Sequence, residues 1–153
     1  MPDLPRDPVM GAEVMAPLRP DETMLAEWQA DKGRYWRSHA IMAVIGGVVA
    51  GGVLLAIGNP SPWVGPVAAI AAMAARGWYL ASEVLEARWR LSDQRLQGPG
   101  GRDISLAQIA LARPFLGDVQ VVTRSGDKHL MKYIAKQDEV VAAIEAAKNG
   151  QEP

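Results

Sequence analysis

The run from Ala40 to Gly58 most constrains this chain, because none of its nineteen side chains is charged or strongly polar. As a helix it would extend about 28 Å, at about 1.5 Å per residue, which matches the hydrocarbon core of a bilayer. A second apolar stretch, from Trp63 to Leu80, is interrupted only by Arg76. Between the two stretches, Asn59-Pro60-Ser61-Pro62 predicts a tight turn.

We therefore expect a transmembrane hairpin over residues 38–82, with spans at about 39–58 and 62–82. The average composition, 49% hydrophobic and 22% charged, resembles that of a soluble protein only because the charged residues lie on both sides of these spans. Two buried helices of a soluble bundle are a weaker alternative, since such helices normally keep a polar face. A cleaved signal peptide fits poorly, because its apolar run would be shorter and would follow a short basic segment.

Cationic side chains flank the spans and are absent from the turn between them. They are Arg6, Arg19, Lys32, Arg34 and Arg37 before the first span, and Arg88, Arg90, Arg95 and Arg102 soon after the second. The positive-inside rule then predicts that both ends of the chain are cytoplasmic. We expect a multi-pass protein of the bacterial inner membrane with only the short turn on the outer side.

Aromatic and arginine side chains near the ends of the spans predict the membrane–water interface. Tryptophan usually lies at headgroup depth, and an arginine within about one turn of a span's end extends its guanidinium toward the same region. The candidates for this interface are Trp36, Trp63, Arg76 and Trp78.

Small residues predict how the two spans pack. Lipid tails are as apolar as the helices, so close approach of the backbones must hold the spans together. Gly47 and Gly51 form a GxxxG pair in the first span. The second span offers Gly65, Ala68, Ala69, Ala72 and Ala75, and of these Ala68 and Ala72 are the packing pair that we expect. The short turn favours an internal contact between these faces, while dimerisation or docking on a larger membrane complex is the alternative.

Two segments precede the hairpin. Residues 1–20 contain five prolines and no apolar periodicity, which predicts a flexible tail. In residues 21–37, Met24, Leu25 and Trp28 have the spacing of one helical face, and acidic residues precede them as at a helix N-terminus. We expect an amphipathic juxtamembrane helix here.

Residues 84–148 predict a small cytoplasmic domain that begins with strands. Apolar residues alternate along Val119–Thr123 and again along His129–Tyr133, and Ser125-Gly126-Asp127 between them is typical of a hairpin turn. Leu106 to Ile109 predicts a single helical turn, and Gly98-Pro99-Gly100-Gly101 predicts a loop.

The last predicted element is a helix with acidic residues in its first turn. Its apolar stripe contains Val140, Val141 and Ile144. We expect this stripe to cover the apolar face of a sheet that carries Val119, Val121, Leu130 and Ile134.

The order of these motifs resembles that of bacterial pleckstrin-homology-like (PH-like) domains. Trp89-Arg90-Leu91-Ser92-Asp93-Gln94-Arg95-Leu96 is similar to their opening, Ile104–Ile109 to a short element ending in isoleucine, Asp118–Gly126 to a late hairpin strand, and Lys132–Ile144 to the closing strand and helix. In this family the domain often follows a pair of membrane spans, and a segment like Leu18–Glu22 often precedes them. The resemblance covers about residues 18–147.

The resemblance implies an α+β membrane protein, in which a two-helix transmembrane hairpin is followed by a small antiparallel sheet or partial PH-like barrel and a C-terminal helix. The middle strands look shortened between Ile109 and Val119, and a complete barrel needs more strands than can be placed after Arg88. Three alternatives follow for the strand that the barrel still needs. The domain lacks it, the N-terminal segment supplies it, or a second copy of the chain supplies it.

No group of residues predicts catalysis, a metal site or a bound cofactor. The absence of cysteine excludes thiol chemistry and cysteine-based metal sites. The glycine-rich loop at residues 98–101 lacks the Lys and Ser/Thr of a phosphate-binding loop. His129 has no metal-binding partner at a suitable spacing, and His39 lies shallower in its span than porphyrin ligands usually do.

The remaining predictions concern partners. Arg88, Arg90, Arg95 and Arg102 are candidates for contact with lipid headgroups or a partner, although acidic neighbours offset their charge. A net charge of −1 argues against nucleic acid. The sequence favours a non-enzymatic inner-membrane protein that presents a PH-like domain to the cytoplasm for protein–protein contact, with a membrane protein or a second copy as partner. An accessory or assembly subunit of a larger membrane complex, for example an energy-transducing one, is the alternative.

Overall fold

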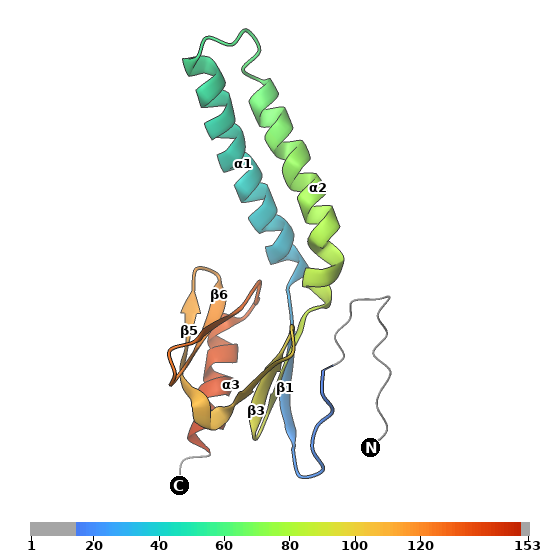
Figure 1. The fold of residues 1–153 in the computed structure, drawn as a ribbon, viewed down its shortest axis with the longest axis vertical. Coiled ribbons are helices and arrows are strands. Elements are labelled where there is room, and N and C mark those ends of the chain that lie inside the picture. The colour runs from blue at the N-terminus through green and yellow to red at the C-terminus, as the bar shows by residue number, and fades with distance from the viewer. Residues whose placement is uncertain (1–14, 151–153) are drawn as a thin grey trace. The chain divides into compact units, whose positions relative to one another are not determined.

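The structure, a computed structural model, describes residues 15–150 of the 153-residue chain. Its described residues divide into two units (Figure 1). Residues 32–85 form a helical hairpin. Residues 15–31 and 86–150 form an α+β domain, so the hairpin is inserted into the sequence of this domain after its first strand. Most of the tail predicted for residues 1–20 lies outside the described residues.

The hairpin consists of helix α1 (Lys32–Ala56) and helix α2 (Val64–Glu86). Gly58, at φ 69°, ends α1 in a left-handed conformation, and its N–H donates to the carbonyl of Leu55 (3.0 Å). The Asn59 side chain then accepts the N–H of Ser61 (2.9 Å). The predicted turn is confirmed. At the ends away from the turn both helices extend beyond the predicted spans of 39–58 and 62–82, because the polar residues there continue the helical backbone. At the turn α1 ends two residues earlier and α2 begins two residues later than predicted.

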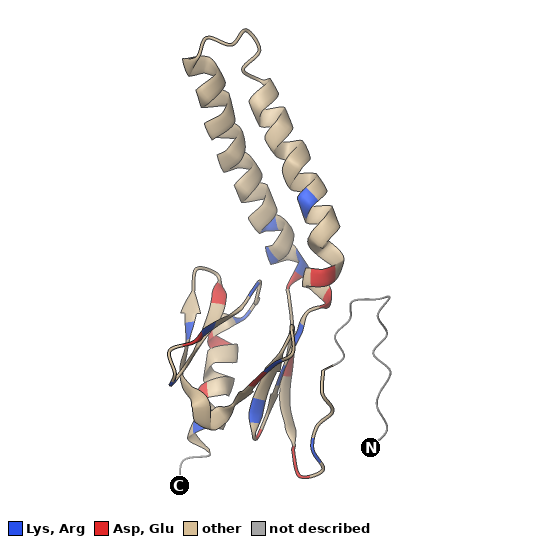
Figure 2. Cartoon of the chain, in the orientation of Figure 1, with Lys and Arg blue, Asp and Glu red and all other residues tan. Residues whose placement is uncertain are grey.

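Charge is sparse along the hairpin (Figure 2). The charged side chains lie near the start of α1 and near the end of α2, and Arg76 is the one nearest the middle of α2. The α+β domain, in contrast, carries both signs of charge along its strands and its helix.

The first sheet of the domain is antiparallel and has the strand order β1-β2-β3-β4. The strands are β1 (Met24–Gln29), β2 (Arg88–Ser92), β3 (Arg95–Gly98) and β4 (Arg102–Ser105). The predicted loop at residues 98–101 is the turn between β3 and β4. Trp89 packs so closely on Gly98 that a Cβ there would lie 2.5 Å from the Trp89 ring, which explains this glycine.

The juxtamembrane helix expected in residues 21–37 is wrong over Met24–Gln29, which form strand β1. Trp28 lies opposite Trp89 of β2 in the register. Met24 and Leu25 are about half exposed, so the spacing that suggested a helical face does not mark a buried face. The partner strand lies some sixty residues later in the sequence, beyond the reach of any local pattern.

The second sheet is antiparallel with the order β5-β6-β7. Its strands are β5 (Ile109–Phe115), β6 (Asp118–Thr123) and β7 (Lys128–Met131), and the 3₁₀ helix η1 (Leu106–Gln108) precedes them. The predicted helical turn and the hairpin turn at Gly126 are confirmed. The segment between Ile109 and Val119, where the sequence suggested shortened strands, contains the whole seven-residue strand β5. β7 ends before Tyr133, whose φ of 59° is incompatible with a strand.

Helix α3 (Gln137–Asn149) closes the domain, as predicted. Val140 and Ile144 are buried in one core with residues of both sheets. Leu130 was expected on the covered face of the sheet, but it is 36% exposed and its neighbour Met131 is fully buried instead. Because side chains alternate along a strand, this one-residue difference in phase moves Leu130 to the outer face.

The fold class is therefore α+β, with two long apolar helices, two small antiparallel sheets and a C-terminal helix. Within residues 15–150 the two sheets do not join into one closed barrel.

Candidate functional surfaces

The outward surface of the hairpin is almost entirely apolar. Val48, Leu55 and Ile70 are 60–70% exposed, and most of the other outward side chains of α1 and α2 are also aliphatic or aromatic. Both helices are long and apolar enough to cross a membrane. Monomeric soluble proteins rarely expose contiguous apolar patches larger than a few hundred Å², so a surface of this kind is unusual for a soluble monomer.

The two helices approach most closely at small residues. A Cβ on Gly65 would lie 2.7 Å from the backbone of Ala50 and Gly51, and one on Gly47 would lie 3.3 Å from Cα of Pro66. The predicted packing face of α1 is therefore the contact face.

On α2 only part of the predicted small-residue set lies at the contact with α1. Gly65, Pro66 and Ala69 face α1, whereas Ala68 and Ala72 are exposed. Small residues recur at i and i+4 on two faces of α2, as Gly65 with Ala69 and as Ala68 with Ala72. The sequence alone does not distinguish which of the two faces contacts α1. Gly65 identifies the contact face, because even a methyl group at this position would clash with the backbone of α1.

We expect replacement of both Gly47 and Gly51 by Leu to separate α1 from α2, because the larger side chains meet Pro66. The packing free energy between the helices should fall, because close approach of the two backbones is what holds apolar helices together. The yield of cross-links between cysteines placed on facing positions of α1 and α2 measures the effect. Gly52→Leu is the matched control, since a Cβ at Gly52 meets nothing within 4 Å. An unchanged yield in the double variant would show that the glycine face does not hold the helices together.

A polar and aromatic cluster joins the start of α1 to the second half of α2, away from the turn between the helices. The Tyr35 hydroxyl donates to the carbonyl of Gly77 (2.7 Å), and Tyr35 itself is 1% exposed. Trp36 packs on Gly77, where a Cβ would lie 2.7 Å from its ring. The Nδ1–H of His39 donates to the carbonyl of Tyr35 (3.0 Å). This hydrogen-bonded arrangement was not predicted from the sequence. Its only sequence signals are the aromatic pair Tyr35-Trp36 near the start of α1 and Gly77 in the second half of α2.

The four residues predicted at the membrane–water interface fall into two groups. Trp63, Arg76 and Trp78 are exposed on α2 or at its start, as an interfacial role requires. Trp36 is half-buried against α2, so part of its ring stabilises the helix pair.

A buried ion pair ties the chain before α1 to the strands after α2. Nε and Nη2 of Arg95 donate to the two carboxylate oxygens of Glu22, at 2.9 and 3.1 Å. The Arg95 side chain also contacts Asp103 and donates to the carbonyl of Pro17 (3.2 Å). The carbonyl of Ala16 accepts from the Gln97 side chain (3.1 Å). Residues 15–23 are therefore held along β2 and β3.

This arrangement corrects the prediction for Arg95. Its side chain is 7% exposed and fully engaged, so it is not available to lipid headgroups or a partner. Arg88 and Arg90 lie beside Glu27 of β1, at 3.1 and 3.8 Å, and Arg102 donates to the carbonyl of Pro99. Arg88 and Arg102 are exposed, so contact of these two side chains with lipid headgroups or a partner stays a prediction.

Hydrogen bonds from Arg95 lower the pKa of Glu22 from 4.5 to about 2, and those from the Arg19 N–H and the Ser92 hydroxyl act in the same direction against the cost of burial. The folded state thus binds the proton more weakly than the unfolded state does. The stability that this pair contributes is complete above about pH 4.5 and is lost as the pH falls toward 2.

We therefore expect acid to destabilise the domain between pH 4.5 and 2. Glu22→Gln should flatten this part of the stability profile, because its amide does not titrate. Thermal unfolding of the full chain in mild detergent across this pH range measures it. A profile with the same slope in Glu22→Gln and in the parent chain would assign the acid sensitivity to other carboxylates.

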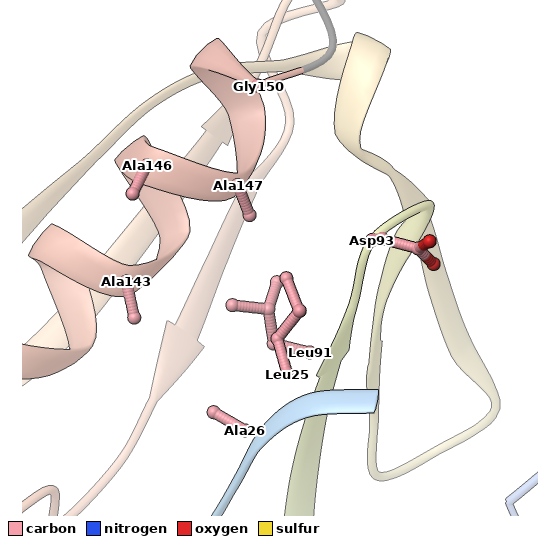
Figure 3. Close-up of a pocket in the computed structure, with 8 residues that line it drawn as sticks. All are labelled: Leu25, Ala26, Leu91, Asp93, Ala143, Ala146, Ala147 and Gly150. Atoms are coloured by element: carbon pink, nitrogen blue, oxygen red, sulfur yellow. The ribbon is translucent and has the colours of Figure 1, made fainter. Parts of the chain in front are cut away.

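A shallow groove of about 450 Å³ lies between α3 and the first sheet (Figure 3). Leu25, Ala26 and Leu91 line one side, and Ala143, Ala146 and Ala147 line the other. The carboxylate of Asp93 points away from the leucines (Figure 3) and accepts the N–H of Thr23 (2.9 Å). The groove is open because the facing residues of α3 are alanines. Its lining suits apolar groups.

Among residues 15–150, no three His, Asp or Glu side chains lie together as a metal site. Comparison of the chain with protein-family models, with curated proteins and with solved structures found no match.

Proposed function

We propose that this chain is a non-enzymatic protein of the bacterial inner membrane, in which α1 and α2 cross the bilayer and a PH-like domain is presented in the cytoplasm for contact with another protein. The observation that carries this proposal is the apolar outer surface of the hairpin, with Val48, Leu55 and Ile70 exposed. Transfer of such side chains from water to an apolar phase is favourable by about 25 cal/mol for each Å². In a bilayer the same side chains contact lipid.

The connections of the hairpin support the expected orientation. Both α1 and α2 join the same α+β domain, which supports an arrangement with the start of α1 and the end of α2 on one side of the membrane. Cationic residues concentrate at these ends, and the turn at residues 59–62 has none. The positive-inside rule assigns that side to the cytoplasm.

The strand count supports the PH-like interpretation. The sequence left open how the missing strand was supplied, and β1 from the N-terminal segment pairs with β2 (Met24 opposite Ser92, Gln29 opposite Arg88). With β1 included, four strands and then three strands precede a closing helix.

Topology reporters test the orientation. Fusions at residue 150 and before Arg19 should both give the cytoplasmic signal, because both lie on the arginine-rich side of the hairpin. A fusion in the turn at Ser61 should give the opposite signal. A periplasmic signal from either of the first two fusions would exclude the proposed hairpin.

The second candidate is an accessory or assembly subunit of a larger membrane complex. It is favoured by Gly52, which is exposed on α1 with no atom within 4 Å of its Cβ position and so leaves a place for close approach of another helix. Purification in mild detergent separates the two candidates. Co-migration with large subunits in fixed stoichiometry, lost in Gly52→Leu, would support the accessory role, whereas a homo-oligomer alone would exclude it.

A further inference from the structure

The turn between β5 and β6 exposes a leucine that the fold does not require. Leu116 is 91% exposed and has a φ of 48°, and Gly117 after it has a φ of 92°. Tight hairpin turns of this kind favour Asn or Asp at the first position, because those side chains tolerate the left-handed conformation. Neither burial nor turn geometry explains a leucine here, and backbone strain of this kind is often found at functional positions.

The leucine belongs to a larger apolar patch. Leu111 and Phe115 of β5 and Leu130 of β7 are 36–41% exposed. The register places Phe115 and Leu111 on the same face of the second sheet as Leu130, while Val119 and Val121 point to the opposite face, into the core beneath α3. The guanidinium of Arg113, which donates to Gln120 at 2.7 and 2.9 Å, lies within this patch.

The turn lies at the end of the domain from which the chain leaves for α1. The carboxylate of Asp118, two residues after Leu116, accepts the N–H of Tyr133 (2.9 Å). The carbonyl of Tyr133 in turn accepts the N–H of Asp31 (2.7 Å), the last residue before α1. In Figure 1 the β5–β6 turn and the last residues of β1 are at the same end of the domain.

We propose that Phe115 and Leu116 insert into the headgroup region of the bilayer and hold the domain against the membrane. This inference rests on the proposed function, because it needs α1 to enter a membrane. From Asp31 to Ala40, where the uncharged run begins, the helix rises only about 14 Å. Lys132, exposed at the same end, and Arg113 suit anionic headgroups, while the Asp118 carboxylate is already engaged. The tether to α1 raises the local concentration of membrane, so two apolar side chains suffice.

Single-cysteine labelling tests this inference, and the natural chain has no cysteine to interfere. An environment-sensitive dye is attached at Leu116→Cys, at Ser125→Cys or at Val48→Cys in the full chain, which is reconstituted into phosphatidylcholine vesicles containing phosphatidylglycerol. Ser125 is the matched control, because it lies in the exposed turn at the other end of the same sheet. Val48 reports on the hairpin itself, since it is 70% exposed in the middle of α1.

Nitroxide-labelled lipids then report whether each dye contacts the bilayer. We expect the dye at residue 116 to be quenched severalfold more than the dye at residue 125, most strongly by nitroxides near the headgroup, because interfacial insertion is about 5–10 Å deep. Equal, weak quenching at 116 and 125 with strong quenching at 48 would overturn the inference and leave the membrane hairpin intact. Shielding of residue 116 from iodide without quenching by the lipid nitroxide would also overturn it, because it indicates a protein contact. Absence of quenching at 48 would overturn the proposed function, and the inference with it.

Discussion

Replacing Ile144 by Asp is expected to unfold the α+β domain and to leave the proposed membrane hairpin of α1 and α2 inserted. Ile144 is fully buried on the face of α3 that packs on Val121 and the rest of the core. Loss of a buried Ile side chain to Ala costs about 2–5 kcal/mol, and an unpaired buried carboxylate adds to that cost. The total is comparable with the stability of a whole domain, about 5–15 kcal/mol.

Limited proteolysis of membranes measures this effect. We expect new tryptic cleavage after Arg88, Arg95 and Arg124 in Ile144→Asp, with the fragment that contains α1 and α2 still protected. Ala142→Asp is the matched control, because Ala142 is an exposed residue of the same helix. Unchanged protection of the three arginine sites in Ile144→Asp would show that α3 does not hold the two sheets together.

The second large effect is expected from Arg95→Ala. This change leaves the Glu22 carboxylate, whose side chain is 0% exposed, without its main partner. Removal of one member of a buried ion pair costs about 3–5 kcal/mol, because the remaining charge is neither solvated nor paired. The loss should also loosen the segment around Pro17 and Glu22, since Arg95 binds both, while the hydrogen bonds of Ala16 to Gln97 and of Thr23 to Asp93 remain.

Two further variants distinguish the effect of breaking the buried ion pair from the effect of removing any arginine side chain. Arg102→Ala should change the midpoint of thermal unfolding little, because this side chain is exposed and donates only to the nearby Pro99 carbonyl. Glu22→Leu combined with Arg95→Met should recover much of the loss, because an apolar pair of similar volume carries no desolvation cost. A double variant as unstable as Arg95→Ala alone would mean that the contacts to Asp103 and Pro17, rather than the buried charge, account for the effect.

Features with a local signal could be predicted from the sequence. The two long apolar helices, the turn at Asn59, the hairpin turn at Gly126 and the closing helix each depend on residues within about one element. Turn chemistry and helical periodicity determine such elements over short distances.

Features that depend on distant partners could not be predicted. Strand β1 exists because β2 lies beside it, and Arg95 is buried because Glu22, 73 residues earlier, meets it. Likewise, the choice of Gly65 and Ala69 instead of Ala68 as the contact face of α2 depends on α1. The exposed Leu116 has no sequence signal at all, because only its φ and its exposure distinguish it.

The central claim, that α1 and α2 cross the bilayer as a hairpin with the domain in the cytoplasm, can be tested by labelling intact cells with a membrane-impermeant maleimide. Single cysteines at Ser61, in the turn, at Ser125, in the domain, and at Val48, in the middle of α1, give three distinct expectations. We predict labelling of residue 61 in intact cells, of residue 125 only after permeabilisation, and of residue 48 only after the membrane is dissolved in detergent. Labelling of residue 125 in intact cells, or of residue 48 without detergent, would contradict the account.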